Sequence, residues 1–134
     1  MNTKAIGKRS EALISLKFLM LGWVVLTPLG DNERYDLVID RGNGFERVQC
    51  KTGSFRDGVI IFDTMTTMPK AKGGYRKNRY TADEIELFAV YCEHTKGVYL
   101  VPISDVKSNG RLRVDPTKNR QSQNVRWARN YEIP

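Results

Sequence analysis

At 134 residues the chain is long enough for one hydrophobic core but too short for two ordinary domains. Hydrophobic residues make up 40% of it, which argues against disorder, and the formal net charge of +7 favours a polyanionic partner. The apolar run at residues 12–21 is too short to span a bilayer, so we expect a buried helix there and no membrane partner.

The first half of the chain predicts a helix followed by four strands. Residues 7–21 hold good helix formers and no proline, and Gly22 is a suitable C-terminal stop. The segment Arg-Gly-Asn-Gly at residues 41–44 is a strong hairpin-turn signal. Apolar and β-branched runs on either side of this turn and further along predict strands at 23–26, 35–40, 45–52 and 59–62.

The second half predicts a basic loop, a hairpin and a polar tail. Residues 65–79 are rich in proline, glycine and basic residues and predict a loop. Thr81 is the expected N-cap of a short helix ending near Ile85. Further strands are expected at 87–92, 98–101 and, more weakly, 111–114, with a terminal helix near 125–130.

Together the elements predict an α/β fold in a single domain. The core is expected over about residues 1–103, and a basic extension over about residues 104–134. Cys50 and Cys92 lie in separate predicted strands and match no metal-ligand spacing. Two isolated thiols are typical of a reducing compartment, so we expect a cytoplasmic protein.

The positive charge is concentrated in the loop and the tail. Residues 66–80 carry five basic side chains and no acidic one, and residues 106–134 carry seven basic and two acidic ones. Such clustering suits phosphate contact, because each neutralised phosphate releases a condensed counterion. Arginines in the predicted strand 111–114 are expected to read bases, since a β-ribbon fits the major groove. The expected DNA-binding residues are Lys70, Lys72, Arg76, Lys77, Arg79, Arg111, Arg113 and Arg126.

A polar cluster is predicted at one end of the hairpin formed by residues 35–40 and 45–52. Gln49 and Lys51 are two residues apart on a strand, so their side chains share a face. The turn brings Asp36, near the start of one strand, close to both of them, near the end of its partner. Because the flanking residues are apolar, polar side chains at this position indicate a functional site.

This Asp…Gln-x-Lys arrangement resembles the signature of the PD-(D/E)XK nuclease superfamily. The order of elements over residues 1–102 resembles its restriction-endonuclease-like core, a mixed β-sheet flanked by helices (αβββαβ). Glu11 on the first helix is similar to the helical glutamate of many members. Residues 30–39 together with residues 48–53 resemble the small group I intron-encoded homing endonucleases of cyanobacterial type.

The resemblance implies a metal-dependent endonuclease that hydrolyses DNA phosphodiester bonds with Mg²⁺, for which Mn²⁺ would substitute. It implies that Asp36 and the backbone carbonyl of Cys50 bind the metal, and that Glu11 binds or orients metal-bound water. Lys51 would contact the attacking water or a phosphate oxygen. Gln49 stands where many members have an acidic residue, and its side-chain carbonyl can still ligate a metal or position a water.

Three functions are open at this point. A homing-type endonuclease would cut a long duplex target, and one active site per chain implies at least a dimer, or a tetramer. A Holliday junction resolvase-like, structure-selective nuclease would share the core and the charge. A catalytically silent DNA-binding module is favoured only by Gln49.

Overall fold

The computed structural model describes residues 2–106, 109–119 and 124–134, with a single α-helix in those ranges, α1 (Thr3–Met20). This helix begins at Asn2, whose side chain accepts a hydrogen bond from the backbone N–H of Ala5 at 2.8 Å. It ends before Gly22, which adopts the positive φ of +80° expected of the stop. No helix in the described ranges has the length and apolarity needed to cross a membrane.

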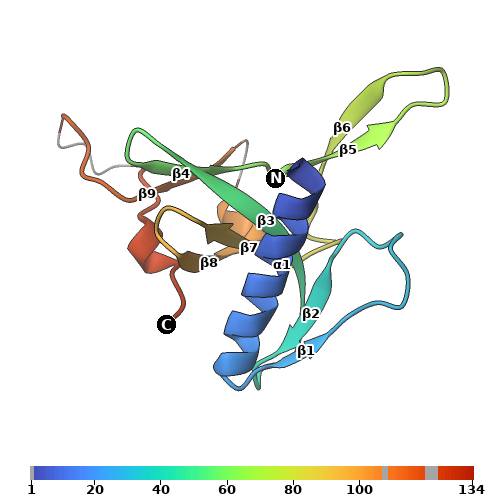
Figure 1. Cartoon of the computed structure of the whole chain (residues 1–134), viewed down its shortest axis with the longest axis horizontal. Coiled ribbons are helices and arrows are strands. Elements are labelled where there is room, and N and C mark those ends of the chain that lie inside the picture. Colours follow the sequence, from blue (N-terminus) through green and yellow to red (C-terminus); the bar gives the residue numbers. More distant parts are fainter. Residues whose placement is uncertain (1, 107–108, 120–123) are drawn as a thin grey trace.

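The helix lies across a sheet in which, over the same ranges, seven strands pair (Figure 1). β3 is the longest strand and pairs in parallel with β7, whereas the other pairings are antiparallel. The sheet is therefore mixed, as predicted. Its strands are β1 (Val24–Leu26), β2 (Leu37–Asp40), β3 (Phe45–Arg56), β4 (Val59–Phe62), β7 (Leu87–Cys92), β8 (Gly97–Pro102) and β9 (Gly110–Arg113).

Two apolar cores lie on opposite faces of the sheet. Ile14 and Phe18 of α1 are fully buried against Val48 of β3 and its neighbours in β2 and β7. On the other face, Phe88 of β7 is fully buried in the second core, beside residues of β4, β8 and β9. All six residues of β7 are buried, which explains why its sequence is continuously apolar rather than alternating.

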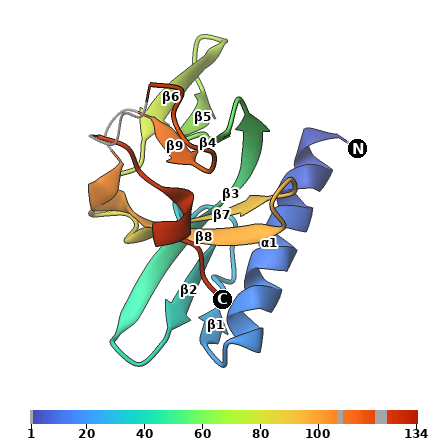
Figure 2. The ribbon, with the colours of Figure 1, turned by 90° about the vertical axis from the view of Figure 1, so that its left-hand side faces the viewer.

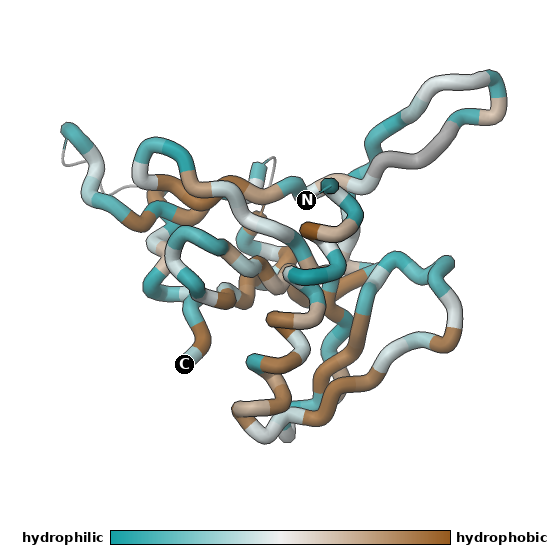
Figure 3. The backbone as a smooth tube through the Cα atoms, viewed as in Figure 1, coloured by the Kyte–Doolittle hydropathy of each residue, from teal (hydrophilic) through white to brown (hydrophobic). Residues whose placement is uncertain are grey.

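The predicted loop at 65–79 is wrong: these residues form a two-stranded hairpin, β5 (Met65–Pro69) and β6 (Tyr75–Arg79). We call it the β5–β6 arm, and it projects from the body of the molecule (Figure 1). Gly73 and Gly74 adopt positive φ at its tip, whereas the basic residues Arg76, Lys77 and Arg79, which also suggested a loop, lie in β6. Figure 3 shows β6 and the tip of the arm to be largely hydrophilic, consistent with the exposure of most of their side chains.

Both short predicted helices are also wrong. After Thr81 the chain makes one helical turn, closed by bonds from Glu84 N–H and Ile85 N–H to the Thr81 carbonyl, and then enters β7. Near the C-terminus only a 3₁₀ turn forms, η2 (Ala128–Asn130). Of the helices predicted to flank the sheet, the described residues therefore contain only α1.

The basic tail is built onto the sheet. After a 3₁₀ turn, η1 (Ile103–Asp105), the predicted strand forms as β9 and pairs with β4. Leu112 and Ala128 are buried in the second core. The last residues run beside β8, where Ile133 N–H donates to the Val98 carbonyl at 3.0 Å (Figure 2). Arg111 and Arg113 therefore lie on a strand of the sheet, and Arg126 lies on the segment bonded to that strand.

Candidate active site

Asp36 is held at the start of β2 by two hydrogen bonds to β3. Its backbone N–H donates to the Val48 carbonyl at 2.9 Å, and its Oδ2 accepts from the Cys50 N–H at 2.9 Å. The side chain thus replaces a backbone acceptor where the β2–β3 pairing ends. This places the Asp36 carboxylate directly at the 49–51 segment, as the hairpin predicted.

Glu11 reaches the same place from α1. The preceding residue, Ser10, is 3% exposed, and its hydroxyl lies 2.6 Å from that of Thr52 on β3. This buried contact fixes how α1 sits on the sheet. Glu11 and Asp36 then line one cleft of about 260 Å³, and we call it the acidic cleft because Asp31 and Glu33 from the β1–β2 loop line it too.

The two facing carboxylates are electrostatically strained. Burial raises the pKa of Glu11, and the negative charge of Asp36 raises it further. Burial also raises the pKa of Asp36, against the opposing effects of the Cys50 N–H and the positive charge of Lys51. Such a pair is relieved by a cation between its members.

The donor set fits a hydrated divalent cation. In the described ranges no three His, Cys, Asp or Glu side chains are close enough to hold an ion by themselves. Mg²⁺ prefers oxygen ligands, retains several waters and needs only one or two carboxylates. Asp36 and Glu11, with the Cys50 carbonyl, would hold such an ion.

Lys51 lies on the opposite face of β3 from Cys50. Val48 and Cys50 contact the first core, so by alternation the side chains of Gln49 and Lys51 share the other face, as predicted. The Lys51 Nζ donates to the Met65 carbonyl at 3.2 Å. Burial lowers the pKa of Lys51, whereas the charges of Asp63 and Asp36 raise it. The structure thus brings Glu11 and Lys51 within electrostatic reach of Asp36, and Gln49 shares the strand face of Lys51.

The predicted DNA-binding residues form two separate groups. Those of the β5–β6 arm are exposed on a projecting ribbon. Arg111, Arg113 and Arg126 line a second cleft of about 220 Å³ beside β9. Arg126 is fixed there through a 3.1 Å bond to the Asn109 carbonyl. β9 and the arm lie toward opposite ends of the molecule's long axis (Figure 1).

Comparison with known proteins gives the family of the chain and the fold that it shares. The profile of the PD-(D/E)XK endonucleases matches residues 1–134. The chain belongs to the PD-(D/E)XK endonuclease family. It is 27% identical over 84 residues to Protein 5.3 of Escherichia phage T7, covering 63% of this chain and 68% of that protein. Its fold is similar to that of the bacterial homing endonuclease I-Ssp6803I, at a TM-score of 0.76 and 24% identity over 98% of this chain and 89% of that one.

The structural match confirms the predicted restriction-endonuclease-like fold and the resemblance to homing endonucleases. Sequence reasoning missed other residues that this PD-(D/E)XK chain places around its site. Asp31 and Glu33 lie within the segment 30–39 that carried the resemblance, so their position was the available signal. Arg34 lies in the same segment, and Tyr80 directly follows the basic residues of the arm, but their contact joins segments far apart in the sequence and could not be predicted.

Proposed function

We propose that this PD-(D/E)XK chain is a Mg²⁺-dependent, homing-type endonuclease that hydrolyses phosphodiester bonds at a long, specific duplex site. The observation that carries the proposal is the Asp36 carboxylate, bonded to the Cys50 N–H and facing Glu11 across the acidic cleft, with Lys51 next to Cys50 on β3. Mn²⁺ would substitute for Mg²⁺, because both accept oxygen ligands.

Each residue has a distinct role in this proposal. Asp36, Glu11 and the Cys50 carbonyl hold the metal. When bound, Mg²⁺ supplies positive charge for the reacting phosphate and lowers the pKa of a coordinated water. Lys51 places its ammonium against the attacking water or a phosphate oxygen, and Gln49 orients water through its amide.

The acidic cleft favours an active enzyme over a silent DNA-binding module. Gln49 removes one negative charge from the usual site. Asp31 and Glu33 add two carboxylates to the lining of the same cleft, so its attraction for a cation is kept. We therefore interpret Gln49 as an adapted residue rather than a sign of lost activity.

DNA would be held by both basic groups. The exposed side chains of the β5–β6 arm suit phosphates, whereas Arg111, exposed on β9, suits a base edge. Arg113 donates to the Asp115 carbonyl at 3.3 Å, and Arg126 is fixed to Asn109, so these two serve as a positioned positive surface. These two basic groups lie toward opposite ends of the long axis (Figure 1), which supports a duplex target longer than one active site requires.

Double-strand cleavage would require at least two copies of the chain, as a dimer or tetramer. Leu16, Leu19 and Met20 on α1 are more than half exposed, which supplies apolar surface for a second copy. Cys50 and Cys92 are both free thiols, consistent with the proposed cytoplasmic location. Light scattering at increasing concentration measures the assembly, and a monomer at all concentrations would contradict it.

The test is selection of cleaved products from a randomised duplex library, with a four-way junction assayed in parallel. Mg²⁺ or Mn²⁺ should give cleavage at one recurring sequence, Ca²⁺ should support binding alone, and EDTA should abolish cleavage. Preferential cutting of the junction would assign the resolvase-like alternative. Binding without cleavage of any substrate would assign the silent module.

A further inference from the structure

The base of the β5–β6 arm is held from both strands by cations of the site. Met65 and Arg79 are paired across the first position of the arm. Lys51 Nζ donates to the Met65 carbonyl at 3.2 Å, and Arg34 Nη2 donates to the Arg79 carbonyl at 3.0 Å. Lys51, the proposed catalytic lysine, and Arg34 therefore each bind one member of the Met65–Arg79 pair that closes the base of the arm.

Both cations also lie against one aromatic ring. The Arg34 guanidinium is 4.4 Å from the centroid of the Tyr80 ring, and Lys51 Nζ is 5.1 Å from it. Each distance is within the range of a cation–π interaction, worth about 0.5–2 kcal/mol. The ring is itself fixed, edge-on against the fully buried Phe88 at 5.7 Å. Its hydroxyl is hydrogen-bonded to Thr66 of the arm.

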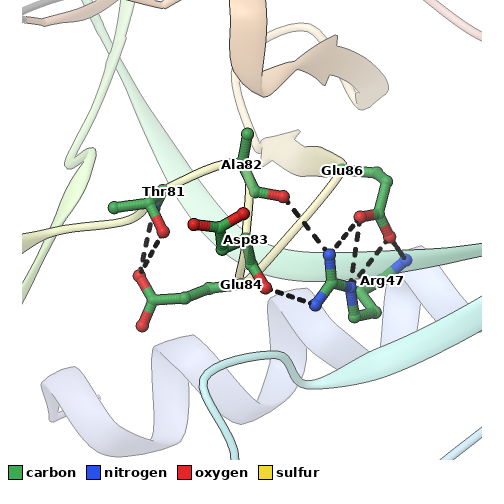
Figure 4. Close-up of polar contacts among 6 residues, drawn as sticks. All are labelled: Arg47, Thr81, Ala82, Asp83, Glu84 and Glu86. Atoms are coloured by element: carbon green, nitrogen blue, oxygen red, sulfur yellow. Dashed lines mark hydrogen bonds and ion pairs between the residues drawn. The ribbon is translucent and has the colours of Figure 1, made fainter.

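Arg34 is anchored in turn by the segment that follows Tyr80. Its Nε lies 2.6 Å from a carboxylate oxygen of Glu84. Glu84 also accepts from the Thr81 N–H at 3.0 Å, which closes the helical turn (Figure 4). Arg34 Nη2 also donates to Glu84 at 3.4 Å, and because Glu84 lies outside the arm, Arg34 is held beside the arm from outside it.

Arg47 at the start of β3 secures this turn. Its guanidinium donates to the carbonyls of Ala82 and Asp83, and it forms an ion pair with Glu86 (Figure 4). A forked guanidinium with several fixed acceptors is a stiff support. Contacts therefore run without a break from the sheet, through the turn and Tyr80, to the ammonium of Lys51.

We propose that Tyr80 and Arg34 are positioning residues that hold the Lys51 ammonium and couple the β5–β6 arm to the reactive centre. This inference rests on the proposed function, in which Lys51 acts on the substrate. A lysine ammonium has three donors, and among the described residues the Met65 carbonyl engages one of them, which leaves two for the substrate. Lys51 then keeps a fixed position relative to DNA bound along the arm.

The first test compares cleavage rate with DNA affinity in Tyr80 variants. Tyr80→Leu removes the ring that carries both cations, so single-turnover cleavage should fall by about tenfold or more, as misplaced reacting groups do. Duplex affinity should stay within about twofold, because the arm keeps its basic side chains. Tyr80→Phe keeps the ring and should cleave within about threefold of the wild type.

The matched control is Phe45→Leu, since Phe45 is 70% exposed at the start of β3, where it pairs with Asp40 outside the arm. It should leave the single-turnover rate unchanged. Equal losses in Tyr80→Leu and Phe45→Leu, or a Tyr80→Leu rate equal to that of the wild type, would overturn the proposal. A Tyr80→Phe variant as slow as Tyr80→Leu would also overturn it.

The second test needs no cleavage. Amide hydrogen exchange at the base of the arm should accelerate by about threefold or more in Lys51→Met and Arg34→Met, because each loses a donor to the closing pair. Lys96→Met is the control, as Lys96 pairs with Glu93 in the β7–β8 turn. Unchanged exchange in both Lys51→Met and Arg34→Met would refute the coupling between the arm and Lys51. This readout decides the coupling even if the wild type proves to cut no DNA, which would refute only the proposed function.

Discussion

Ser10→Ala should destabilise the protein by about 1–2 kcal/mol. Ser10 is 3% exposed, and its hydroxyl lies 2.6 Å from that of Thr52, so the variant leaves the Thr52 hydroxyl without this partner. An unsatisfied buried hydroxyl costs about 1–3 kcal/mol, and the lower part of that range applies because Thr52 is only partly buried. For a chain of this size, each kcal/mol lowers the Tm by roughly 3–5 °C.

The assay is urea denaturation of Ser10→Ala, Thr52→Val and the double variant. Replacing both hydroxyls removes the unsatisfied group. The loss of stability in the double variant should therefore be smaller than the sum of the two single losses by about 1 kcal/mol. Ser54→Ala is the control, because Ser54 is exposed on the same strand, and it should change stability by less than about 0.5 kcal/mol. Strictly additive losses would refute the view that this contact fixes α1 on β3.

Three further predictions address packing, charge and DNA contact. Gly53→Ala would place a Cβ 2.6 Å from the Ile60 side chain, so urea denaturation should show a loss of about 1–3 kcal/mol, and full stability would contradict this packing. Asp36→Asn removes a carboxylate whose pKa is raised by burial. The Tm of the metal-free protein should therefore rise at neutral pH, where the wild-type carboxylate is ionised. This gain should vanish in acid, where both side chains are neutral, and a gain that persists there would count against the charge as its cause. Arg76→Gln should weaken binding to all duplex sequences alike and reduce the salt slope by about one unit, whereas a sequence-selective loss would assign Arg76 to a base.

The proximity of Asp36 to Lys51 could be predicted from the sequence, because a short turn and strand alternation are local properties. The β5–β6 arm could not. Arg76, Lys77 and Arg79 give β6 no apolar alternation, so the sequence offered no strand signal for a ribbon that β6 forms by pairing with β5. The helix expected after Thr81 does not form for a different reason. Arg47 binds Glu86 and the carbonyl of Asp83, which a longer helix would use for its own hydrogen bonds.

The contacts around Tyr80 were also beyond sequence reasoning. Arg34, Lys51 and Tyr80 come from three separate segments, and only the folded sheet brings them to one ring. The place of Asp31 and Glu33 within segment 30–39 was a signal, but only the structure shows that they line the acidic cleft. Local patterns thus predicted the hairpin that carries the candidate site, whereas the long-range packing that supports it required the structure.

Single-turnover cleavage of the selected duplex by the wild type, Lys51→Ala and Asp36→Asn tests the central claim most directly. The wild type should cut in Mg²⁺ and stop in EDTA. Lys51→Ala should be slower by about a hundredfold or more, the scale of losing one preorganised charge, with duplex affinity within about threefold. Asp36→Asn should be similarly slow, and excess Mg²⁺ should restore part of its rate. Cleavage that persists in EDTA, or variants that cut as fast as the wild type, would contradict the assignment of these residues as the active site.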